Sequence, residues 1–108
     1  PDRVFFATNK SSLTTASRAT LRKQATFLRK NKSLNVTIEG HADERGTREY
    51  NLALGERRAN AARDYLMTYG ISGKRISVIS YGKEKPVNPA STPLAWSQNR
   101  RSVTVKVN

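Results

Sequence analysis

The segment 38–66 constrains the fold more than any other part of the chain, because two periodicities meet within it. Val36 and Ile38 alternate with polar residues, as in a half-buried strand, and Gly40 ends that pattern. After a charged loop, turn and capping residue types predict that a helix opens between Arg48 and Tyr50. Steps of three and four give this helix an apolar or small stripe that can lie on a sheet: Leu52, Gly55, Ala59, Ala62, Leu66 and Tyr69. A strand that runs into a helix packed on its own sheet is therefore the centre of the fold.

The rest of the chain supplies a second strand and helix pair and two further strands. The predicted elements are a strand at 4–6, a helix from Thr14 or Thr15 to Asn31, and strands at 76–81 and 102–107. Residues 83–97 contain three prolines and are expected to be irregular, with Trp96 anchoring them on the core. We predict an α+β fold, a two-layer βαβαββ sandwich in which two helices cover one face of a mixed four-stranded sheet. The 108 residues suit a single domain, 1–108.

The charge of the chain is strongly positive, with 20 basic and 8 acidic side chains and a net charge of +12. Such a field attracts anionic polymers and surfaces of several kinds. Basic residues gather on the first predicted helix: Arg18, Arg22, Lys23, Arg29, Lys30 and Lys32. Nucleic acid or another polyanion is therefore an alternative partner, although no zinc-finger, aromatic-strand or helix-turn-helix signature accompanies these residues. We interpret this face as solvated and expect no nucleic-acid partner.

The acidic residues are concentrated, since six of the eight fall inside the segment 38–66. On the predicted helix, Asn51, Leu54 and Arg58 lie on one side, which can face Asp43 in the preceding loop. A carboxylate and a guanidinium at this spacing suit a small zwitterion, with the ammonium on Asp43 and the carboxylate on Arg58. Direct pairing of Asp43 with Arg58, which would only pin the loop to the helix, is the structural alternative.

Three runs of residues carry a resemblance to a known family: 39–47 (Glu-Gly-His-Ala-Asp-Glu-Arg-Gly-Thr), 54–59 and 79–86. Together with 97–101 they resemble the periplasmic domains similar to the C-terminal domain of outer membrane protein A, in particular the peptidoglycan-associated lipoproteins among them. The resemblance covers essentially the whole chain. It implies noncovalent binding of peptidoglycan through the diaminopimelate of its stem peptide, and no enzymatic activity.

The resemblance also implies which residues bind. It places the ligand-binding aspartate on Asp43 and the ligand-binding arginine on Arg58, with Arg45, Asn51 and Leu54 lining the site. In the first loop, Thr8 and Asn9 stand where the family usually carries an aromatic or similar residue followed by aspartate. Asn9 brings no negative charge, so we expect a weaker ammonium contact there. We also expect that Arg58→Ala loses most wall binding while the domain stays folded.

The resemblance further implies a place in the cell and partners. The expected location is the periplasmic face of the outer membrane of a Gram-negative bacterium, with a signal peptide, a lipidated cysteine and a linker upstream of this segment. The expected protein partner is the β-propeller component of the Tol assembly, in a system that acts in cell division.

Catalysis and metal binding find little support in the residues. His41 is the only histidine and the chain has no cysteine, so neither a three-ligand zinc site nor a serine nucleophile with its base and orienting group is expected. We interpret His41 as a hydrogen-bonded residue at a strand end. No cofactor is expected.

Overall fold

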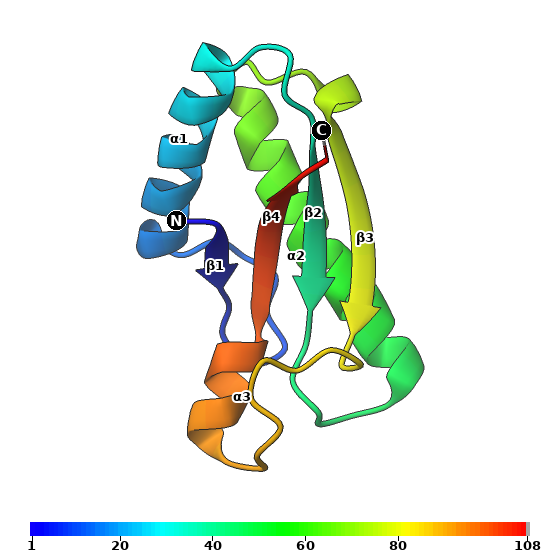
Figure 1. The fold of residues 1–108 in the computed structure, drawn as a ribbon. Coiled ribbons are helices and arrows are strands. Elements are labelled where there is room, and N and C mark those ends of the chain that lie inside the picture. The colour runs from blue at the N-terminus through cyan, green and yellow to red at the C-terminus, as the bar shows by residue number, and fades with distance from the viewer. Residues whose placement is uncertain (108) are drawn as a thin grey trace.

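The computed structural model describes residues 1–107, which form a single sheet and its covering helices. The elements in chain order are β1 (Arg3–Phe5), α1 (Thr15–Lys30), β2 (Val36–His41), α2 (Arg48–Thr68), a 3-10 turn η1 (Gly73–Arg75), β3 (Ile76–Gly82), α3 (Pro93–Asn99) and β4 (Arg101–Lys106). The strand order is β1-β4-β2-β3, with β2 and β3 parallel and β4 antiparallel to both of its neighbours. Helices α1 and α2 cover one face of this mixed sheet (Figure 1). The predicted α+β sandwich is confirmed.

The two long helices begin at capping threonines. The Thr14 side chain accepts a hydrogen bond from the Ser17 amide, and the Thr47 side chain accepts one from the Tyr50 amide. Each bond satisfies an N–H group that has no partner within its helix. Glu49 in the first turn of α2 also suits the positive end of the helix dipole. Both helices therefore start within the limits that the sequence predicts.

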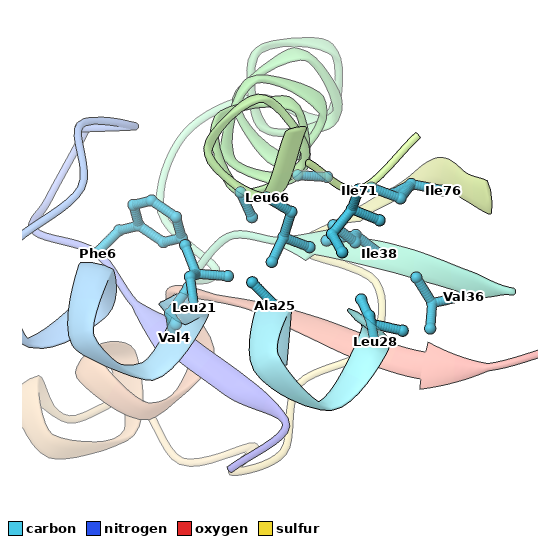
Figure 2. Close-up of a cluster of buried hydrophobic side chains, with 12 residues drawn as sticks. Val4, Phe6, Leu21, Ala25, Leu28, Val36, Ile38, Leu66, Ile71 and Ile76 are labelled. Carbon is cyan, nitrogen blue, oxygen red and sulfur yellow. The ribbon is translucent and has the colours of Figure 1, made fainter. Parts of the chain in front are cut away.

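The core lies between the helices and the sheet, and its side chains come from α1, α2, β1, β2, β3 and the segments that join them (Figure 2). It contains Val4, Phe6, Leu21, Ala25, Leu28, Val36, Ile38, Ala59, Ala62, Leu66, Ile71 and Ile76. The predicted stripe of α2 supplies its centre, since Ala59, Ala62 and Leu66 are fully buried. Burying this apolar surface is the main favourable contribution to the stability of the domain.

Helix α2 lies very close to the sheet where Gly40 of β2 faces Gly55. A Cβ atom on Gly40 would collide with the Gly55 carbonyl, so only glycine allows this approach. The contact lies between the end of β2 and the first half of α2. It therefore brings the loop after β2 close to the side of α2 that carries Asn51, Leu54 and Arg58.

The segment expected to be irregular contains helix α3, so that part of the prediction is wrong. Pro93 occupies the first turn of the helix, where no N–H is needed, and the Thr92 side chain caps it by accepting a bond from Ala95. The Asn99 side chain accepts bonds from the amides of Val87 and Asn88, which ties the preceding loop to the helix. Proline therefore starts a helix here.

None of the described helices is long and apolar enough to span a bilayer.

Candidate ligand-binding pocket

A pocket of about 480 Å³ lies where the loops after β1 and β2 meet the first half of α2. Its lining consists of Thr8, Asn9, Asp43, Arg45, Gly46, Tyr50, Asn51, Leu54 and Arg58. All seven residues predicted from the sequence as ligand-binding belong to this lining. The structure brings them together from three separate segments, and their role in binding stays a prediction.

Arg58 forms the inner wall of the pocket and is completely buried. Its Nε donates to the Lys10 carbonyl at 2.9 Å, Nη1 to the His41 carbonyl at 2.9 Å, and Nη2 to the Ala7 carbonyl at 3.1 Å. Within the described residues, these bonds use three of its five N–H donors and leave two unused. Burial, together with the charge of Arg100, lowers the pKa of Arg58 to about 10. The guanidinium therefore stays charged at neutral pH.

Asp43 forms the acidic part of the pocket and is only 7% exposed. Its Oδ1 accepts from the amide and the Nε of Arg45 at 3.0 and 3.2 Å, and its Oδ2 accepts from Arg45 Nη2 at 2.8 Å. Arg100 Nη1 lies 3.5 Å from Oδ2. Burial raises the pKa of Asp43, but the bonds from Arg45 and Arg100 outweigh burial, so the pKa lies below its usual value. The carboxylate is therefore ionised at neutral pH.

The structure does not contain the direct Asp43–Arg58 pair that was the structural alternative. Among the described residues, Asp43 forms its ion pairs with Arg45 and Arg100, while Arg58 donates to main-chain carbonyls. The two opposite charges therefore face one pocket without cancelling each other.

Arg45, a predicted lining residue, packs against Trp96, and this contact was not predicted from the sequence. The Arg45 guanidinium lies 4.2 Å from the centre of the Trp96 ring, and its Nη2 donates to Thr8 Oγ1 at 3.3 Å. Trp96 is fixed in turn, since its Nε1 donates to Glu44 Oε2 at 2.8 Å. The expectation that Trp96 anchors its segment on the core is therefore wrong, because the half-buried ring packs on a charged partner instead.

Asn51 fixes the shape of the loop that carries Asp43. Its Nδ2 donates to the carbonyls of Arg45 and Thr47 at 2.8 and 3.0 Å. Leu54 is buried beside it and supplies an apolar part of the pocket. Asn51 is therefore a positioning residue for the 43–47 loop.

Sequence reasoning missed Gly46 and Tyr50, which line the pocket, and Arg100, which lies beside Asp43. All three stand in or beside the runs that carried the family resemblance. Their position in those runs was the available signal, because charge and spacing do not distinguish them from ordinary loop and surface residues.

His41 is buried at the end of β2 but makes no hydrogen bond through its ring among the described residues. Its Nε2 lies 3.7 Å from Glu39 Oε1, and the ring stacks on Tyr81. Burial, with Arg101, Lys85 and Arg3 nearby, lowers the pKa of His41 to about 4, so the ring is neutral at neutral pH. The interpretation as a hydrogen-bonded residue is wrong, because packing against Tyr81 holds the ring instead. No group of three metal-ligating side chains occurs in residues 1–107.

Residues 5–100 of this chain match a family model described as the OmpA family. A peptidoglycan-associated lipoprotein of Rhizobium meliloti (strain 1021) is 59% identical over 104 residues, which is 96% of this chain and 59% of that protein. One from Mesorhizobium japonicum is 54% identical over 103 residues, 95% of this chain and 61% of that protein. The chain thus spans about three fifths of the length of these curated relatives.

Solved structures agree with the fold. The crystal structure of the peptidoglycan-associated lipoprotein from Burkholderia pseudomallei superposes with a TM-score of 0.96 at 37% identity, covering 99% of this chain and 91% of that one. The C-terminal domain of Helicobacter pylori MotB superposes with a TM-score of 0.92 at 19% identity, covering 100% of this chain and 85% of that one. The second likeness concerns the fold alone.

Proposed function

This chain belongs to the OmpA family, and we propose that the domain is a noncatalytic module that binds peptidoglycan through the diaminopimelate of its stem peptide. The observation that carries this proposal is the pocket in which Asp43 and Arg58 present opposite charges without pairing. Relatives that are more than half identical to this chain are named for their association with peptidoglycan, which supports the same assignment.

The free end of diaminopimelate carries an ammonium and a carboxylate on one carbon, and the pocket offers a partner for each. The two remaining N–H donors of Arg58 suit the carboxylate, because charge-assisted bonds from a guanidinium are strong and directional. Asp43 suits the ammonium. Arg58 cannot swing away, because three carbonyls hold it, and a pre-positioned charge binds without a cost in side-chain ordering.

In the full-length protein this module would tether the outer membrane to the cell wall. A lipid anchor upstream of the segment would hold the protein at the periplasmic face of the outer membrane of a Gram-negative bacterium. The β-propeller protein of the Tol assembly is the proposed protein partner. Names of relatives support the wall and lipid parts of this proposal, and the family resemblance supports the Tol part.

The test is calorimetric titration with a soluble stem peptide ending in meso-diaminopimelate, repeated with a lysine analogue that lacks the distal carboxylate. Saturable binding of the first peptide alone is expected. Asp43→Asn keeps an oxygen for Arg45 but removes the charge, and we expect it to weaken binding about tenfold or more, as for one charge-assisted bond.

Asp64→Asn is the matched control, because Asp64 is an exposed acid on helix α2 and outside the pocket. It should bind as the parent does. Equal binding of both peptides, or unchanged binding by Asp43→Asn, would show that the site is wrongly assigned. Binding that nucleic acid abolishes but free diaminopimelate does not would favour the polyanion alternative.

A further inference from the structure

The carboxylate assigned to the ligand ammonium already has a cationic partner within the protein. Arg45 contacts both Asp43 oxygens, at 3.2 Å through Nε and 2.8 Å through Nη2. A ligand ammonium that approaches Asp43 therefore meets a site occupied by a guanidinium. Because Arg45, Arg58 and Arg100 surround a single acid, an added cation is also repelled as long as Arg45 stays in place.

The two arginines that line the pocket differ in how firmly they are held. Arg58 is fully buried and bound to three main-chain carbonyls, so releasing it would leave those carbonyls without partners. The Arg45 side chain is 41% exposed, and apart from Asp43 its guanidinium has only Thr8 Oγ1 and the Trp96 ring as described contacts. Arg45 can therefore leave Asp43 for solvent at a much smaller cost.

Trp96 determines where Arg45 rests. Its ring stacks on the guanidinium, and its bond to Glu44 fixes the ring beside the loop that carries Asp43. A cation over an indole face gains about 0.5 to 2 kcal/mol, depending on exposure. Trp96 belongs to helix α3, which contributes no residue to the lining of the pocket. Through Trp96 this helix nevertheless helps to hold the Arg45 charge beside Asp43.

We propose that Arg45 is an internal competitor for the ligand ammonium, that binding exchanges the Asp43–Arg45 pair for an Asp43–ammonium pair, and that Trp96 sets the strength of the competition. This inference rests on the proposed function, since it concerns the same pocket and the same class of ligand. Asp43 and Arg58 then bind the ligand, whereas Arg45 and Trp96 tune its affinity.

The sign of one affinity change tests the proposal. Arg45→Gln removes the competing charge and keeps the Arg45 amide bond to Asp43, so we expect the diaminopimelate peptide to bind about three- to tenfold more tightly. Trp96→Phe keeps a weaker aromatic contact and should tighten binding less. The gain should vanish for a peptide whose distal amino group is replaced by hydrogen, because that ligand does not need Asp43.

Arg48→Gln is the matched control, because it removes one positive charge close to the pocket but outside its lining. Its affinity should stay within about twofold of the parent, since exposed charges are screened. Trp96 is the only tryptophan, so its fluorescence reports on the Arg45 contact. Saturating peptide should change the emission of the parent and leave that of Arg45→Gln nearly constant.

Two results overturn this inference and leave the proposed function intact. One is unchanged or weaker peptide binding by Arg45→Gln relative to Arg48→Gln, which would make Arg45 neutral or a ligand contact. The other is calorimetric binding by the parent with no change in Trp96 emission, which would leave Arg45 in place. Absence of binding to the parent and to Arg45→Gln alike overturns both proposals.

Discussion

Arg58 and Arg101 are both buried, yet of the two only Arg58 lines the pocket described above. Each donates to main-chain carbonyls, and burial lowers the pKa of each. Arg58 shares its pocket with Asp43, which Arg45 and not Arg58 neutralises. Arg101 instead lies near the buried ring of His41, and its Nε has no partner among the described residues. We therefore propose that a buried arginine marks a binding site where it lines a pocket together with an acid that it does not neutralise.

The largest expected effect is a difference in stability between variants in which each of these two arginines is replaced by methionine. Arg58→Met leaves three carbonyls, two in the first loop and one at the end of β2, without donors, so we expect it to lower the free energy of unfolding by about 4 kcal/mol. Arg101→Met frees two carbonyls and also removes an unsatisfied Nε, so its cost should be about 1 to 2 kcal/mol. Urea denaturation followed by circular dichroism measures both.

This prediction qualifies the expectation that Arg58→Ala loses most wall binding while the domain stays folded. Arg58 also holds the first loop to the end of β2, so its removal affects stability as well. Peptide binding should be lost in Arg58→Met and kept in Arg101→Met. If Arg101→Met were the less stable variant, or if it lost the peptide, the distinction between a site arginine and a structural arginine would be wrong.

The second expected effect concerns the buried histidine beside Arg101. The pKa of His41 falls from 6.5 to about 4 in the folded protein, so between these values the unfolded chain takes up the proton and the folded chain does not. Stability should therefore fall as the pH drops from 6.5 to 4, by roughly 3 kcal/mol at 1.36 kcal/mol per pH unit. Urea denaturation at several pH values in this window measures the slope.

His41→Gln provides the comparison, because glutamine does not titrate. The groups around His41 are Glu39, Tyr81, Arg101, Lys85 and Arg3, and among them only Glu39 would favour the protonated ring. The pKa of Asp43 lies below 3.8, so that carboxylate loses its contribution only under more acidic conditions. An identical slope in parent and variant between pH 6.5 and 4 would mean that His41 is protonated as easily in the folded state as in the unfolded chain.

Most of the fold could be predicted because its determinants are local. The alternation in β2, the threonine caps and the stripe of α2 each follow from a few neighbouring residues, and the structure agrees with all three. Helix α3 was missed because Pro93 was taken as a breaker, although proline suits the first turn of a helix.

The pocket was predictable only in part, for a different reason. Asp43 and Arg58 stand in recognisable runs, and the step from strand to helix places them near each other. The contact of Trp96 with Arg45 joins residues 51 positions apart, and no periodicity in either segment specifies it. The unbonded state of the His41 ring likewise depends on what Tyr81, Lys85 and Arg101 place around it, which is decided by the sheet and the loop together.

The smallest expected effect arises in the first loop, at the position where the family usually carries aspartate. Asn9 lines the pocket and adopts a left-handed backbone conformation with φ of 57°, which asparagine and aspartate both tolerate better than most residues. Asn9→Asp should therefore fold without added strain. The pocket has more cations than acids, so nearby arginines should partly neutralise the new carboxylate. We therefore expect Asn9→Asp to tighten binding of the diaminopimelate peptide only about threefold.

Calorimetry on Asn9→Asp, with Asn9→Ser as the uncharged control, shows whether the new carboxylate contacts the ligand ammonium or only the arginines. A contact with the ammonium strengthens binding only of peptides that keep the distal amino group. A charge that merely neutralises the arginines would instead weaken binding of every peptide with a distal carboxylate, and that outcome would leave Asp43 as the sole acid that recognises the ammonium.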